Sequence, residues 1–454
     1  MSSRAALVRH PVAIAGAVIA TVAAVVFIAL AIAVAIGLLD NPYAGLVVFI
    51  AVPALFVAGL LLMPLGMWLQ RRWLRRHPGR ETDWPILDFR RPEVRRRALL
   101  FTALTAVNVV ILLLAGYSSL HWMESPPFCG QVCHTPMTPQ FTAWQAATHR
   151  QVACVDCHIG EGVRGFVYAK ANGTRQLLHV ATGAFPRPIP PGAEMPPGTQ
   201  ASTCQGCHSP GRIVGDRLRV IREYADDEAS TETMTVLQLH VGRPSSSGRA
   251  IHWHADPDTR VEYVATDHGQ QTIPYVKVTD ARGVVKEFKT EAATDQLIRD
   301  GEHRTMDCID CHNTVGHPIA PTAEQAVDRY IARTWVSRQL PFVRRESVKL
   351  MKASYPTSDA GAEQIGQGLR ALYGARSAPA DQQALTHTVN ALQGLYRRSV
   401  FPTMKVTWGS YPDNRGHTTS NGCFRCHDDS HTAGDGSTIS GDCEYCHKQI
   451  ENPL

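Results

Sequence analysis

The twelve cysteines of this 454-residue chain fall into six short pairs, and a histidine directly follows each pair. Five of the pairs have two residues between the cysteines, and the first pair has three. The six motifs are Cys129, Cys133 and His134; Cys154, Cys157 and His158; Cys204, Cys207 and His208; Cys308, Cys311 and His312; Cys423, Cys426 and His427; and Cys443, Cys446 and His447. These pairs use every cysteine, so none remains for a disulfide or a reactive thiol.

The spacing of these motifs is the attachment signature of c-type haem. Two thiols must reach two vinyl groups on one porphyrin edge, so they project from one side of a single turn. The adjoining histidine then provides an axial ligand to the iron. Zinc ribbons also use C-x-x-C pairs, but they need no histidine directly after the second cysteine. In the first motif, positions i and i+4 still share a helical face. The motifs therefore predict six covalently bound c-type haems.

Histidine on both sides of every iron would require six further ligands. Several histidines outside the motifs lie near one in the sequence, and two form an HWH triplet. The candidate second ligands are His149, His240, His252, His254, His303, His317, His417 and His431. A lone histidine is more often an ordinary surface or core residue than a ligand, and the sequence does not assign a candidate to a particular haem.

Met137 lies three residues after His134 in a proline-flanked segment. Most methionines fill cores, but this position beside a haem motif makes Met137 a further ligand candidate. A thioether ligand raises the potential of a haem relative to two histidines. The first haem is therefore expected to differ from the others if Met137 binds it.

All of these motifs follow a strongly apolar N-terminal region. Its three uncharged runs predict membrane-spanning helices at about 12–39, 44–70 and 98–120, each long enough for a bilayer that needs about 20 residues. The first run is too long for a signal peptide and lacks an obvious cleavage site. Residues 1–120 are therefore predicted to form a transmembrane anchor.

Arginines predict the orientation of this anchor. The loop at 71–97 contains ten arginines and only four acidic residues, whereas the connection between the first two runs has no basic residue. By the positive-inside rule the N-terminus and this loop are cytoplasmic. Three crossings of the inner membrane then place the haem motifs on the periplasmic, or extracytoplasmic, side.

The water-facing part divides by pattern. Residues 121–320 carry motifs one to four, and strand-like alternation predicts a small β-meander inserted at about 250–290. The cysteine-free residues 321–400 have helical periodicity and are expected to form a spacer or docking segment. Residues 401–454 carry motifs five and six. We therefore expect a mainly α membrane protein, with a three-helix anchor and a multihaem domain of little regular structure.

Several segments resemble the NapC/NirT family of membrane-anchored multihaem cytochromes. They include FCGQVCHTPM at 128–137, CVDCHIG at 154–160, and the K-x-x-G-x-x-Q spacing of Lys170, Gly173 and Gln176. TMDCIDCHNTVGHP at 305–318 and HTTSNGCFRCHDDSH at 417–431 resemble larger, many-haem relatives. The resemblance covers residues 99–454 loosely and residues 128–190 most specifically.

The resemblance implies a quinol dehydrogenase of anaerobic respiration. The first haem would lie beside a quinol pocket, with Met137 as a ligand and Lys170 matching the lysine near that pocket. Gln176 stands where many members have an aspartate, and it cannot accept the quinol's proton, which puts the proton route in doubt. The implied partners are the membrane quinone pool, with menaquinol as the expected quinol, and an extracytoplasmic electron-accepting protein.

The chain also departs from this family pattern. Typical members have one span and four or five haems, whereas three spans and six motifs are predicted here. The two extra helices would stiffen the anchor or contact another membrane subunit. The net charge of +5 is too small to indicate nucleic-acid binding.

Two other functions compete with electron transfer. A terminal reductase of a small oxyanion needs an open axial position, yet all six motifs end in histidine. A redox sensor would need a signalling module, and none is recognisable in the sequence. The sequence therefore favours electron transfer from quinol through six haems.

Overall fold

The computed structural model describes residues 10–35, 38, 47–76, 89–132, 134–159, 162–191, 200–209, 213–242, 250–376 and 378–451. The chain divides into two compact units, residues 1–132 and 133–454. It is mainly helical with a few small sheets, which confirms the predicted fold class.

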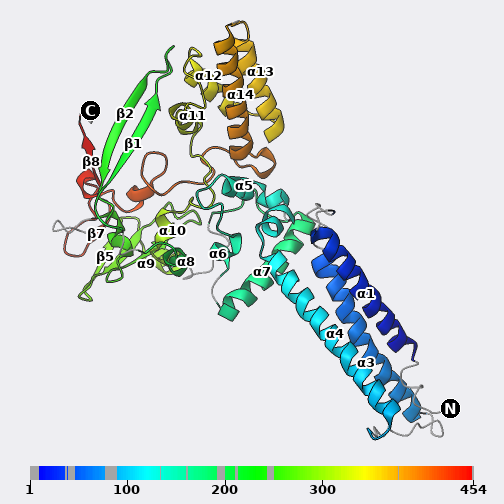
Figure 1. Cartoon of the computed structure of the whole chain (residues 1–454). Helices are drawn as coiled ribbons and strands as arrows, with labels where there is room; N and C mark the ends of the chain where they lie inside the picture. Colours follow the sequence, from blue (N-terminus) through cyan, green and yellow to red (C-terminus); the bar gives the residue numbers. More distant parts are fainter. Residues whose placement is uncertain are drawn as a thin grey trace. The chain divides into compact units, whose positions relative to one another are not determined.

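The first unit contains the three helices that are long and apolar enough to cross a membrane. They are α1 (Pro11–Ala35), α3 (Val52–Arg76) and α4 (Pro92–Met123), with the short η2 (Val47–Ala51) leading into α3. Figure 1 shows α1, α3 and α4 side by side. Their outward side chains are apolar, for example Val25, Phe101 and Leu113, as expected for helices that face lipid.

Small residues let α1 and α3 pack closely. A Cβ added to Gly16 would lie 2.7 Å from the carbonyl oxygen of Gly59, and one added to Gly66 would lie 2.4 Å from the backbone nitrogen of Ala13. Such close backbone approach is typical of helix pairs in membranes, where van der Waals packing replaces the hydrophobic effect. The two helices are therefore a matched pair rather than two independent spans.

The helices extend into the arginine-rich stretch. α3 continues to Arg76, and α4 begins at Pro92 with the proline in its first turn, a position that suits its fixed φ and missing N–H. Apolar runs therefore underestimate helix length, because backbone hydrogen bonding continues past the hydrocarbon boundary. The remainder of the predicted loop, 77–88, lies outside the described residues.

In both units the haem motifs lie in short helices. They are η3 (Phe128–Val132) and α5 (His134–Gln145), α6 (Cys154–His158), α8 (Gln200–Gln205), α10 (Cys308–Cys311), η7 (Gly422–Arg425) and η8 (Cys443–Tyr445). Other helices in this region are α7 (Gly162–Thr182), η5 (Ile251–Ala255), α9 (Asp295–Asp300) and η6 (Pro402–Met404). Most motif helices are a single turn long, so they have little stability of their own.

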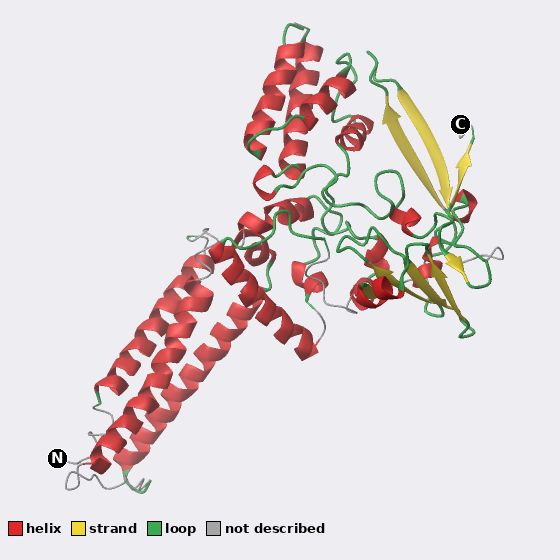
Figure 2. Ribbon diagram, turned by 180° about the vertical axis from the view of Figure 1, so that it is seen from behind, coloured by secondary structure: helices red, strands yellow, loops and turns green. Residues whose placement is uncertain are grey.

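Two antiparallel sheets lie among these helices (Figure 2). The predicted meander is present as β3 (Arg260–Ala265), β4 (Tyr275–Thr279) and β5 (Val285–Lys289), flanked by β6 (Glu302–Thr305) and β7 (Thr432–Ala433) in the order β6-β3-β4-β5-β7. The second sheet has the order β1-β2-β8 and was not predicted. It comprises β1 (Arg217–Tyr224), β2 (Glu232–Leu239) and β8 (His447–Ile450), with Leu239 opposite His447. Charged residues on β1 hide its strand pattern in the sequence.

The cysteine-free segment forms a helical bundle, which comprises residues 323–399. Its helices are α11 (Ala323–Ala332), α12 (Val343–Lys352), α13 (Ser358–Tyr373) and α14 (Pro379–Ser399). They share one apolar core that includes Val327, Ile365 and Leu392. Thr322 and Thr357 cap α11 and α13 by accepting hydrogen bonds from backbone N–H groups. The predicted helical segment is thus a bundle with its own core.

Candidate haem sites

Five of the six motif histidines face a second histidine from outside the motifs. The distance between ring centroids is 5.8–6.2 Å in all five pairs. The pairs, with the motif histidine first, are His158 with His317, His208 with His149, His312 with His252, His427 with His254, and His447 with His417. Each of these five motif histidines therefore has its own partner.

This separation fits two imidazoles bound to one metal ion. Two metal–nitrogen bonds of about 2 Å each, together with the distance from each nitrogen to its ring centre, place the two centroids about 6 Å apart. The angle between the ring planes varies from 1° for His252 and His312 to 84° for His254 and His427. Two axial ligands can turn independently about their common axis, so this variation is compatible with ligation. The donor set therefore fits haem iron at five motifs.

In several candidate ligands, a hydrogen bond at one ring nitrogen leaves the other ring nitrogen available to bind a metal ion. The Nδ1 atoms of His252 and His254 lie 2.7 Å and 2.8 Å from the carbonyl oxygens of Val241 and Ile251. His317 and His427 have the same kind of contact, at 2.9 Å from the carbonyl oxygens of Gln140 and Ser440. A carbonyl only accepts, so Nδ1 carries the proton and Nε2 keeps its lone pair. Metal-binding histidines are commonly oriented in this way.

Burial keeps some of these imidazoles neutral. It lowers the pKa of His254, and the charge of His427 lowers it further, outweighing the hydrogen bond to Ile251. Burial likewise lowers the pKa of His317. Only neutral imidazole binds a metal ion, so these low pKa values favour the ligand form at neutral pH.

The pairs connect distant parts of the second unit. The HWH triplet in η5 contributes His252 to the fourth motif and His254 to the fifth. His149 precedes the second motif but faces His208 of the third. The side chains of Cys204 and Cys308 also contact each other through a hydrogen bond. The motifs are thus close neighbours in space, although long segments separate them in the sequence.

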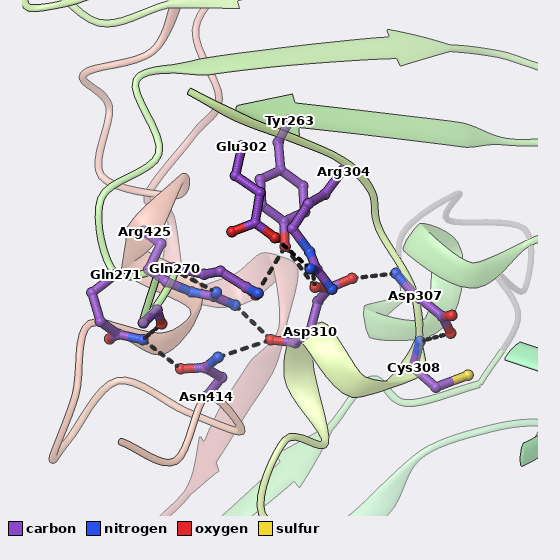
Figure 3. Close-up of polar contacts among 11 residues, drawn as sticks. Tyr263, Gln270, Gln271, Glu302, Arg304, Asp307, Cys308, Asp310, Asn414 and Arg425 are labelled. Carbon is purple, nitrogen blue, oxygen red and sulfur yellow. Dashed lines mark hydrogen bonds and ion pairs between the residues drawn. The ribbon is translucent and has the colours of Figure 1, made fainter. Parts of the chain in front are cut away.

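A buried polar network joins the fourth motif to the fifth (Figure 3). Asp310, inside the fourth motif, accepts a hydrogen bond of 2.5 Å from the Tyr263 hydroxyl and lies 3.4 Å from Nε of Arg304. Arg425, inside the fifth motif, donates to the backbone oxygen of Asp310 at 2.8 Å, and Asn414 donates to the same oxygen at 3.0 Å. Burial raises the pKa of Asp310 despite these donors. The sequence indicates this link only by placing an acidic residue, Asp310, inside the fourth motif and a basic residue, Arg425, inside the fifth.

The first motif is only partly described. Cys129 lies in η3, while Cys133 and the side chain of His134 lie outside the described residues. Met137 is half-buried on α5, one turn after His134.

The other three candidate histidines have different surroundings in the described part of the chain. His240 lies 3.1 Å from an Asp216 carboxylate oxygen. His431 is buried, with Nε2 2.7 Å from the carbonyl oxygen of Ile273. His303 lies on β6 and is exposed. The structure pairs none of these three with a motif histidine by ring contact among the described residues.

Lys170 and Gln176 both lie on α7, and both are half-buried. This helix contains no acidic residue. Its exposed side chains include the apolar Val167, Tyr168 and Leu178. The helix thus combines basic and apolar character, which suits an apolar ligand that carries polar oxygens.

Two comparisons with known proteins found similarities to this chain. Residues 91–188 match the model of the NapC/NirT cytochrome c family, N-terminal region. The chain is also 34% identical over 451 residues to the cytochrome c-type protein ImcH of Geobacter sulfurreducens, covering 97% of this chain and 88% of that protein. No solved structure matches the chain.

Proposed function

The chain belongs to the NapC/NirT family of membrane-anchored multihaem c-type cytochromes, and on that premise we propose that it oxidises quinol, with menaquinol the expected donor. It passes the electrons through six haems to an extracytoplasmic redox protein. The haem domain lies on the periplasmic side of the inner membrane, in accord with the arginine-rich connection between α3 and α4.

The five histidine pairs are the observation that carries this proposal. In each pair the motif histidine and the second histidine lie at a separation at which they would hold one haem iron between them. Haem supplies one-electron redox chemistry, and a haem with both positions filled offers no site for a small oxyanion. The pairs therefore support electron transfer over a terminal reductase.

The quinol site is proposed to include α7. Oxidation of a quinol releases two electrons and two protons, so the site must hold an apolar ring and orient its polar oxygens. Lys170 donates a hydrogen bond to a quinol oxygen, and the apolar side chains of α7 favour the ring. Gln176 orients the ligand by hydrogen bonding, because an amide does not take up a proton at neutral pH. Met137 is proposed as a ligand of the first haem.

The test follows haem absorbance of the full chain in lipid nanodiscs after addition of a menaquinol analogue. The wild type is expected to be reduced rapidly, and Lys170→Ala more slowly by about 10- to 100-fold, because a hydrogen bond from a charged donor contributes about 1.5–3 kcal/mol. Arg175→Ala is the matched control, since Arg175 is a basic residue on the same helix. It is expected to behave like the wild type.

Two results would contradict the proposal. If quinol fails to reduce wild-type protein that dithionite still reduces, another membrane subunit must be the electron donor. If Arg175→Ala is as slow as Lys170→Ala, general positive charge on α7, rather than a contact of Lys170, controls the reaction.

A further inference from the structure

An aromatic residue of the fifth motif contacts the second histidine of the sixth. Phe424, which lies between the two cysteines of the fifth motif, stacks its ring on the imidazole of His417. The two ring centroids are 4.3 Å apart, and the ring planes are inclined by 22°. The same imidazole faces His447 of the sixth motif at 6.2 Å and 20°. Two consecutive motifs therefore meet at one candidate ligand.

The second histidines of three other sites are oriented by the backbone instead. His252, His254 and His317 each place Nδ1 2.7–2.9 Å from a carbonyl oxygen, the usual way of fixing a metal-binding imidazole. Among the residues that the structure describes, neither ring nitrogen of His417 has such a partner. Nδ1 of His447 is buried and has no described hydrogen-bond partner either. At the sixth site the stacked aromatic ring is therefore the contact that can fix the second histidine.

Two backbone hydrogen bonds hold Phe424 against this imidazole. The Cys423 N–H donates to the Gly416 carbonyl oxygen at 3.1 Å, and the Phe424 N–H donates to the Asn421 carbonyl oxygen at 2.7 Å. Gly416 directly precedes His417, so the first of these bonds closes the chain between the histidine and the fifth motif. Haem attachment at Cys423 would anchor the same point of the chain. The position of the aromatic ring is thus set by the backbone of the fifth motif.

We propose that Phe424 is a positioning residue for the sixth haem, because its ring keeps His417 on the iron and so keeps this haem closed to small ligands. The inference rests on the proposed ligation of this iron by His447 and His417, and it is independent of which molecule donates the electrons. A histidine that turns away from the iron leaves an axial position open. Stacking of two rings shifts such an equilibrium by about 2- to 10-fold.

The test measures carbon monoxide binding to the full chain in nanodiscs, reduced with dithionite. Carbon monoxide binds reduced haem iron at a free axial position, so its binding rate reports how often the second histidine detaches. Phe424→Leu removes the ring but keeps an apolar side chain, and one haem is expected to bind carbon monoxide about 2- to 10-fold faster than in the wild type. Phe424→Tyr keeps the ring and is expected to restore the wild-type rate. Phe424→Ile is a second ring-free variant in case Phe424→Leu does not retain six haems.

Two further variants identify the haem and control for the loss of an aromatic ring. His417→Ala removes the second histidine, so one haem more than in the wild type should bind carbon monoxide at once. In that background Phe424→Leu should add nothing, because the two changes act through the same contact. Trp335→Leu is the matched control, since Trp335 is a bundle aromatic that is 39% exposed against 40% for Phe424. It is expected to bind carbon monoxide like the wild type.

Three outcomes would overturn the inference. Wild-type binding kinetics in a ring-free variant that retains six haems by mass spectrometry would exclude a role of Phe424 toward the ligand. An equal acceleration by Phe424→Leu in the His417→Ala background would show that the ring acts on another haem. If His417→Ala exposes no additional haem, the proposed ligation by His417 is itself wrong. Dithionite supplies the electrons throughout, so a failure of quinol oxidation remains distinguishable from a failure of this inference.

Discussion

The helical bundle and the haem-bearing segments of the second unit are held together in different ways. The bundle has a continuous apolar core in which Val327, Leu340, Ile365, Val389 and Leu392 are fully buried. The haem-bearing segments consist mostly of single-turn helices and loops, and they are joined mainly by histidine pairs and the polar network of Asp310, with a small apolar cluster that includes Phe288 and Cys426. The first region uses the hydrophobic effect, whereas the second is organised around groups that the polypeptide must acquire.

Helix length explains this difference. Isolated helices shorter than about 12–15 residues are marginal in water, and α6, α8 and α10 have five, six and four residues. Their stability must come from covalent attachment and ligation, in the way that a bound metal ion contributes its binding energy to folding. The bundle needs no such help, because α13 and α14 have 16 and 21 residues and pack against each other.

The largest expected effect therefore comes from preventing haem attachment. Expression without haem ligation to the cysteines should leave residues 323–399 protected from hydrogen exchange, while α6, α8, α10 and η7 exchange freely. Mass spectrometry of exchanged peptides from the apo and holo chains measures this. Equal protection of the motif helices in both forms would show that the polypeptide alone organises them, and the comparison would fail.

A truncation in the apolar core tests whether the bundle is stabilised independently of the haem sites. Leu392→Ala should lower the free energy of unfolding of the bundle by about 2–5 kcal/mol, through lost burial and a residual cavity. Leu372→Ala is the control, because Leu372 in α13 is 51% exposed. Chemical denaturation followed by circular dichroism measures the loss, with the haem spectrum expected to stay unchanged. A changed haem spectrum would mean that the bundle core also supports the haem sites.

Gly422 tests a haem-bearing segment without touching a ligand. It precedes Cys423 with a φ of 46°, and a Cβ there would lie 1.4 Å from the Gly416 oxygen. Gly422→Ala should therefore destabilise the fifth site by at least about 2 kcal/mol, seen as loss of the second histidine ligand, followed by haem absorbance, at a lower denaturant concentration. Gly434→Ala, where a Cβ meets nothing within 4 Å, should match the wild type. Equal behaviour of the two variants would mean that the 416–422 turn rearranges freely.

The smallest effect is expected from Tyr263→Phe. This change removes the hydroxyl that donates to Asp310, but Arg304 and the Asp307 N–H remain as partners of the carboxylate. We expect a loss of about 1–2 kcal/mol, with six haems retained. The exposed Tyr168→Phe serves as control in the same denaturation experiment. A loss of haem from the fourth or fifth motif would show that this network matters more than the ligand pairs.

Local chemistry made much of this protein predictable. The five or six residues of each motif contain both thiols and the adjoining histidine, and the apolar runs reflect the thickness of a bilayer, so both signals are complete within short segments. The family resemblance and the three apolar helices, predicted from these segments, are confirmed. The helical segment was also predictable, because its periodicity reflects burial against neighbouring helices.

Tertiary structure decided which histidine faces which motif. His317 lies five residues from His312 but faces His158, and His149 lies nine residues from His158 but faces His208. Proximity in the sequence is therefore a poor guide, because the two ligands of one iron must approach from opposite sides and usually come from different segments.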